Sequence, residues 1–189
     1  MNIAMKPVRA LKKLNHVEFV HPPGERHLVR ALFDLLGFDM LEVYDGEYVI
    51  GVIDPATFEE ANNENYIAGR EVRPEQWAFD RQLAEALKQE PLAGTHAVHE
   101  QVLSDKPQDG MHFGIHFETV EAWEEAVSRV GAVESSTPEL TGRVRLLATF
   151  RPSDPDSEFG LRQAFVWTDI ISTGSLAFGQ RIELAGPVG

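Results

Sequence analysis

The chain has 189 residues, 43% of them hydrophobic and 25% charged, which is the composition of a globular protein rather than of a disordered or fibrous one. It contains no cysteine, and this excludes disulfides, a thiolate nucleophile and Cys-ligated metal sites. The net charge of −13 argues against nucleic acid or an anionic membrane as a partner, and no run approaches the roughly 18 consecutive apolar residues of a membrane span. We therefore expect a cytoplasmic protein.

The first 13 residues form a basic segment. Residues 1–13 contain Lys6, Arg9, Lys12 and Lys13 and no acid. The apolar core of at least seven residues that a signal peptide needs does not follow. We interpret residues 1–13 as a basic N-terminal arm.

Residues 14–73 have the pattern of a first βαβββ module. Alternation over residues 14–21 predicts a strand with Val17 and Phe19 on one face and His16 and Glu18 on the other. Leucines at helical spacing predict a helix from about residue 25 that ends at Gly37. Two strands over 38–44 and 47–54 then enclose Asp45-Gly46, which is a hairpin signal.

Residues 74–110 are predicted to connect two modules. A proline at the start and one apolar stripe predict a helix over 74–90. Residues 95–110 show no clear periodicity, and we expect a loop over 104–110.

Residues 111–189 repeat the pattern of the first module. Alternation over 111–117 predicts a strand with His112 and His116 on its polar face, and Thr119 is placed to cap a helix that ends at Gly131. Strands are expected over 144–150, 163–170 and 180–184. Each half thus opens with a histidine-bearing strand, continues with a glycine-terminated helix and ends in strands, which predicts an internally repeated α+β fold.

A candidate site follows from the polar faces of these strands. His16 and His112 occupy matching places in the two modules, and imidazole is a ligand for Zn, Fe, Ni and Cu. Glu183, between Ile182 and Leu184, is expected to face the same polar space. Taken singly, each histidine is better explained as a buried side chain that is satisfied by a neighbouring carbonyl or carboxylate, and it is their matching places in two similar modules that favour a ligand or cavity role.

Three more residues are weaker candidates. Glu71, near the end of the first module, is the suggested counterpart of Glu183, although a surface acid before a helix is an alternative. His116 and Glu18 share the polar faces and are expected to orient a ligand imidazole or to line a cavity.

The segments "LNHVEFV" and "MHFGIHFETVEAWEEA", with the terminal "QRIEL", resemble the vicinal oxygen chelate superfamily, which includes glyoxalase I, bleomycin-resistance proteins and extradiol dioxygenases. The resemblance runs from Leu14 to Leu184. It implies a glyoxalase-like fold, in which two βαβββ modules form a curved mixed sheet around a cavity. It further implies a divalent metal (Zn, Ni, Mn or Fe) held by His16, His112 and Glu183, with Glu71 as a fourth ligand in a glyoxalase-like set.

The resemblance implies a metal-dependent lyase or isomerase that chelates neighbouring oxygens of a small substrate and stabilises an enolate-like intermediate, with Glu71 or Glu18 moving the proton. Two alternatives remain open. One is a metal-free small-molecule binding protein of the resistance type, and the other is an Fe(II) extradiol dioxygenase that uses the triad without Glu71. A homodimer is expected, because such modules often complete their sheets across subunits.

Overall fold

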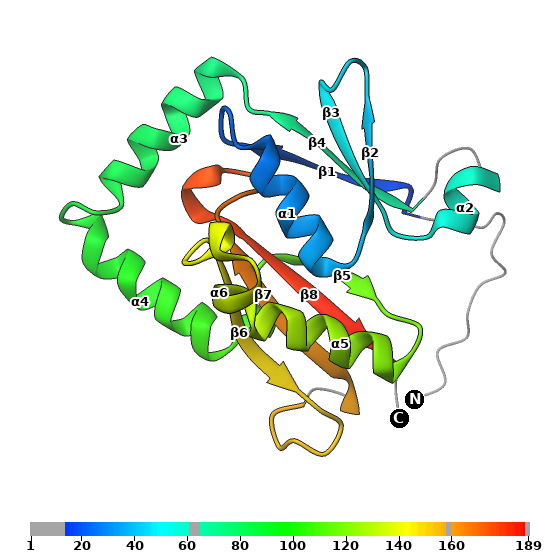
Figure 1. The fold of residues 1–189 in the computed structure, drawn as a ribbon. Helices are drawn as coiled ribbons and strands as arrows, with labels where there is room; N and C mark the ends of the chain where they lie inside the picture. The colour runs from blue at the N-terminus through cyan, green and yellow to red at the C-terminus, as the bar shows by residue number, and fades with distance from the viewer. Residues whose placement is uncertain (1–13, 61–64, 158–159, 188–189) are drawn as a thin grey trace, which may run out of the picture.

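The computed structural model describes residues 14–60, 65–157 and 160–187, so the predicted basic arm over 1–13 lies outside the described residues. The fold is α+β, with two four-stranded mixed sheets in the orders β1-β4-β3-β2 and β5-β8-β7-β6 (Figure 1). Each sheet contains the strands of one of the two units that the sequence predicts. Within the described ranges, no helix combines the length and apolarity needed to cross a membrane.

The first module runs from β1 to β4. Its elements are β1 (His16–His21), α1 (Arg26–Leu36), β2 (Asp39–Val43), β3 (Tyr48–Val52), α2 (Pro55–Glu60) and β4 (Tyr66–Glu71). The predicted helix ends at Gly37 as expected. Gly37 has a left-handed backbone conformation (φ 85°), which is common at helix ends and unfavourable for residues other than glycine. β1 pairs in parallel with β4, while β2, β3 and β4 pair antiparallel, and Asp45-Gly46 lies in the predicted hairpin turn.

The second module has the same order of strands and of its first helix, but its additional helix, α6, directly follows α5. Its elements are β5 (His112–His116), α5 (Val120–Gly131), α6 (Val133–Ser136), β6 (Val144–Phe150), β7 (Arg162–Thr168) and β8 (Gln180–Gly186). Thr119 caps α5 as predicted, since its hydroxyl accepts a hydrogen bond of 3.1 Å from the Ala122 amide. β5 pairs in parallel with β8, and the remaining pairs are antiparallel.

Two helices connect the modules. α3 (Pro74–Ala86) is the predicted connecting helix, whereas α4 (Leu92–Asp105) occupies a stretch in which the sequence predicted no element, and only the short 3-10 turn Pro107–Asp109 follows it. The described side chains of α4 include one buried hydrophobic residue, Leu103. A helix that buries so little has no apolar stripe, and this is why periodicity did not reveal it.

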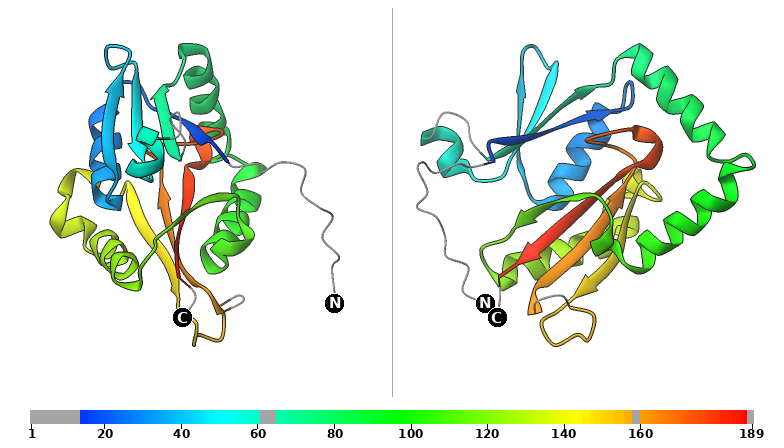
Figure 2. Two further views of the ribbon diagram at one scale, coloured as in Figure 1. Left: turned by 90° about the vertical axis from the view of Figure 1, so that its right-hand side faces the viewer. Right: turned by 180° about the vertical axis from the view of Figure 1, so that it is seen from behind.

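Helices lie on opposite sides of the sheets (Figure 2). α1 and α5 pack against each other on one side, and α3 and α4 lie on the other. One buried hydrophobic cluster includes Phe33 of α1, Trp123 of α5 and Ile182 of β8, so the modules share a core. Packing is tight inside it: a Cβ at Gly69 would lie 2.1 Å from the ring of Phe19, which requires glycine there.

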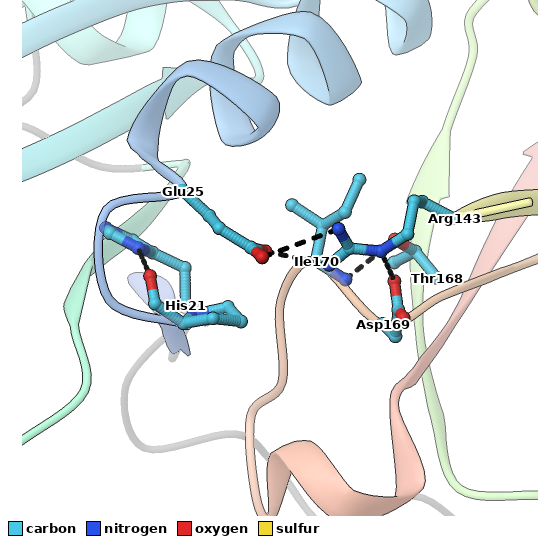
Figure 3. Close-up of polar contacts among 7 residues, drawn as sticks. His21, Glu25, Arg143, Thr168, Asp169 and Ile170 are labelled. Carbon is cyan, nitrogen blue, oxygen red and sulfur yellow. Dashed lines mark hydrogen bonds and ion pairs between the residues drawn. The ribbon is translucent and has the colours of Figure 1, made fainter. Parts of the chain in front are cut away.

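An ion-pair group also joins the modules (Figure 3). Arg143, just before β6, donates to Glu25 before α1 at 2.7 Å and to Asp169 after β7 at 2.5 Å. Burial opposes the charge of Arg143, but hydrogen bonds to Glu25 and Asp169 outweigh it and raise the pKa of the guanidinium. The group therefore fixes the start of the first module's helix to the second module.

We predict that Glu25→Gln lowers the free energy of unfolding by about 1–2 kcal/mol, because it leaves a half-buried guanidinium with one carboxylate partner instead of two. The matched control is Glu124→Gln. Glu124 pairs with Arg151 at 2.8 Å with both side chains over 40% exposed, and its loss should cost under about 0.5 kcal/mol. Urea unfolding measures both, and equal effects of the two variants would contradict the junction role.

His21 makes the fold sensitive to acid. Its side chain is fully buried, and its Nδ1 donates to the Pro22 carbonyl at 2.8 Å. Burial is the largest influence on its ring and lowers the pKa of His21 below 6.5, against the opposing influences of the Pro22 carbonyl and Glu71. The unfolded chain therefore binds a proton more readily than the folded one as the pH falls below about 6.5.

We predict that stability is full above this pH and declines below it, and that His21→Asn reduces the decline, since the amide keeps a donor for Pro22 but does not titrate. The exposed His27→Asn is the control and should leave the decline unchanged. Urea midpoints at pH 7.5 and 5.5 test this. An undiminished acid loss in His21→Asn would assign the sensitivity to other groups.

Candidate functional site

The register of β5 and β8 brings His112 and Glu183 together. In this parallel pair His112 lies opposite Arg181, and Gly114 lies opposite Glu183. The side chains of His112, Arg181 and Glu183 therefore share one face of the sheet. His112 Nε2 lies 3.2 Å from Glu183 Oε2, with the two side chains 23% and 15% exposed. The sequence predicted both residues as site candidates.

Neighbouring groups orient both side chains. The Gly110 carbonyl, which can only accept, lies 2.7 Å from His112 Nδ1, so this nitrogen carries a hydrogen. Gln163 Nε2 donates to Glu183 Oε1 at 2.8 Å. Gly114 leaves the carboxylate its space, because a Cβ there would lie 3.3 Å from Glu183 Oε2.

This arrangement has a chemical consequence. With a hydrogen fixed on Nδ1, the Nε2 lone pair of a neutral His112 would point at a carboxylate oxygen of Glu183, and two acceptors do not attract. A proton on one of them or a cation between them satisfies both. The pair can therefore exchange a proton or ligate a metal ion.

The first module contains a second His–Glu pair at His16. His16 Nε2 lies 3.7 Å from Glu18 Oε1, its Nδ1 contacts Asn15 Oδ1 at 2.9 Å, and its ring stacks on Tyr66 with 5.1 Å between centroids. Both side chains are more exposed than those of His112 and Glu183, at 38% and 63%. The contacts of His16 thus lie within its own module.

The two pairs differ in the strand that supplies the acid. Counting from each histidine by register, the β4 position that corresponds to Glu183 is Ala68, which lies opposite Glu18. In the second module the acid is on the last strand and the small residue, Gly114, is on the first. In the first module the acid, Glu18, is on the first strand and the small residue, Ala68, is on the last.

Glu71 lies elsewhere. It is opposite His21, five residues farther along β4 than the partner of His16, which is about 16 Å in a strand, and it is on the other face of the sheet. Its carboxylate accepts a 2.8 Å hydrogen bond from the Gly24 amide. The structure therefore does not bring Glu71 to His16 as a fourth ligand, and its carboxylate stabilises the turn before α1.

His116 shares the face of His112 at the far end of β5, opposite Ala185, and is exposed. It lies four residues from His112, which is about 13 Å along a strand.

A cavity of about 520 Å³ adjoins His112. Val17, Met111, Phe113 and Phe178 supply apolar surface, and Arg181 and Glu100 are charged groups at its wall. This volume is in the range of small-molecule sites. Strands from both modules, α4 and the segment between β7 and β8 all contribute to it.

Sequence reasoning missed Gln163, Arg181 and Glu100. Alternation along β8 offered a signal for Arg181, because residues two apart on a strand share a face. Glu100 could not be found, since the helix that carries it was not predicted.

Within residues 14–60, 65–157 and 160–187, no three His, Asp or Glu side chains converge in a way that could hold a metal ion. Of the expected ligands His16, His112 and Glu183, the structure brings His112 and Glu183 into contact, and His16 contacts Glu18 instead. The chain matches no model of a known protein family and no curated protein sequence.

We predict that ¹⁵N-labelled protein shows a hydrogen on Nδ1 of His112 at neutral pH, because the Gly110 carbonyl requires a donor. Gly114→Val should displace the Glu183 carboxylate and move the Nε2 resonance of His112. Gly142→Val, where a Cβ would meet nothing within 4 Å, is the control for a changed glycine, although its φ of 74° adds backbone strain. A His112 ring with hydrogen on Nε2 alone would contradict the assigned tautomer.

Proposed function

We propose that the chain is a divalent-metal-dependent enzyme that acts on a small oxygen-containing substrate in the cavity beside His112, as the resemblance to the vicinal oxygen chelate superfamily implies. The observation that carries the proposal is the His112–Glu183 contact, in which Nε2 of the imidazole and a carboxylate oxygen lie 3.2 Å apart. The two four-stranded sheets agree with the glyoxalase-like fold that belongs to this proposal.

The donor set fits a metal ion in part. His112 and Glu183 offer the nitrogen and oxygen ligands that Zn, Ni, Mn and Fe accept, and each is oriented by a hydrogen bond to a further group, as metal ligands commonly are. His16 would be the third ligand by the resemblance, but its contacts are with Glu18 and Tyr66. When bound, such a metal supplies charge that polarises a substrate carbonyl.

The chain's own residues have definite parts in this proposal. Gly110 fixes the tautomer of His112, and Gln163 holds one oxygen of Glu183 so that the other faces the imidazole. Phe113 and Phe178 line the cavity beside His112 and supply apolar surface for a substrate. The resemblance offers Glu18 for moving a substrate proton, but the carboxylate of Glu18 contacts His16, and Val17 rather than Glu18 lines the cavity. Glu71 is left out because it lies on the sheet face opposite to His16 and its carboxylate accepts from the Gly24 amide.

Metal binding tests the proposal. Calorimetric titration of untagged, EDTA-treated and desalted protein with Zn²⁺, Ni²⁺, Mn²⁺ and Fe²⁺ should show one site for at least one ion. His112→Gln and Glu183→Gln should each weaken binding by about 10–100-fold or more, because each removes a ligand.

Glu18→Gln is the matched control for Glu183→Gln, since it changes the same group in the equivalent pair of the first module and should leave affinity within about twofold. His16→Gln decides whether His16 is a third ligand, by lowering affinity or leaving it unchanged. Binding that survives both His112→Gln and Glu183→Gln, or no binding of any of the four ions, would contradict the proposal.

A second candidate function is metal-free binding of a small molecule. It is favoured by the apolar side chains at the cavity, where Met111 is 93% and Phe178 42% exposed, an arrangement typical of surfaces that cover a ligand. Ligand affinity that is the same with and without EDTA and with no turnover would favour it.

A further inference from the structure

Arg181 is a buried cation at the cavity wall whose donors are incompletely used. The residue is 7% exposed, and within the described part of the chain its Nε has no hydrogen-bond partner. Its Nη2 lies 3.2 and 3.4 Å from the two carboxylate oxygens of Glu100. These contacts are longer than the 2.7–2.9 Å typical of a charge-assisted hydrogen bond, and one nitrogen serves both oxygens.

The position of Arg181 relates it to the site. It lies directly opposite His112 in the β5–β8 pair, on the same face and about 4.8 Å away across the strands. Arg181 and His112 both line this cavity. Its methylene stem packs near the loop that holds His112, since a Cβ at Gly110 would lie 3.3 Å from Arg181 Cδ. A group bound by Arg181 is therefore held next to the His112–Glu183 pair.

We propose that Arg181 binds the carboxylate of a small, largely apolar carboxylic acid in this cavity, and that this carboxylate replaces Glu100 on the guanidinium. The planar guanidinium matches a carboxylate in two parallel hydrogen bonds, a geometry that the Glu100 contact lacks. Val17, Phe113 and Phe178 suit an apolar body for the ligand. This inference rests on the proposed function, because it takes the same cavity as the substrate site.

The charges at the cavity favour a single negative charge. Arg181 is its one permanent cation among the lining residues, while Glu100 and Asp109 are acidic and Glu183 lies beside His112. A doubly charged phosphate group would meet more repulsion from these acids than a carboxylate does.

The test uses 3-phenylpropionate as the probe and 3-phenylpropionamide as its uncharged counterpart of nearly equal shape. Calorimetry in EDTA keeps the experiment independent of metal, so its result is separate from that of the metal titration. We expect the carboxylate to bind at least tenfold more tightly than the amide. Equal affinity for the two probes, or tighter binding of inorganic phosphate, would overturn the proposal.

Two variants assign the effect to Arg181. Arg181→Met should reduce 3-phenylpropionate affinity at least tenfold and leave the amide's affinity unchanged, which a loss of folding would not do. Glu100→Gln, on the partly exposed surface of α4, removes the competing carboxylate and should raise the affinity severalfold. If Glu100→Gln lowers the affinity for 3-phenylpropionate or leaves it unchanged, the ligand carboxylate does not replace Glu100 on Arg181.

Discussion

The parallel pairing of the first and last strands of each module is the constraint on which the site depends. A parallel pair fixes which side chains stand opposite each other, and a shift of one residue would turn each to the other face. In the second module the register sets Glu183 opposite Gly114 and two residues beyond Arg181. The contact between His112 and Glu183, the room for the carboxylate and the closeness of a buried cation all follow from that one alignment.

The same register explains how two similar modules come to carry different chemistry. Each has a histidine near the start of its first strand and an acid within reach, but the acid is on β8 in one module and on β1 in the other. Glu183 is on β8, which lies between β5 and β7, and its carboxylate accepts from Gln163. Glu18 is on β1, an edge strand of its sheet, and its side chain is 63% exposed. A carboxylate that is more buried and hydrogen-bonded is better defined in position. The second module therefore holds the more ordered pair.

Local signals predicted several turns and helix ends correctly. Asp45-Gly46, Gly37 and Thr119 each act through their immediate neighbours, so the hairpin, the helix end and the cap could be predicted without knowing the rest of the chain. Pairing across the sheet could not be predicted in this way. "REV" near Glu71 resembles "RIEL" near Glu183 in letters, yet by register the counterpart of Glu183 is Ala68, three residues earlier. Likewise α4 makes few apolar contacts, and its Glu100 meets Arg181 across 81 residues of sequence.

The cavity belongs to the junction of the modules rather than to either one. Val17 comes from β1, while His112 and Phe113 come from β5, and the segment between β7 and β8 that completes the wall pairs with β1 through Val20 and Ser172. Its shape therefore depends on the relative position of the two sheets, which the shared core and the Glu25–Arg143–Asp169 group maintain. Because a displacement of about 1 Å can decide whether a ligand meets its partners, the proposed binding of a small molecule in this cavity would depend on the same ion pairs that join the modules.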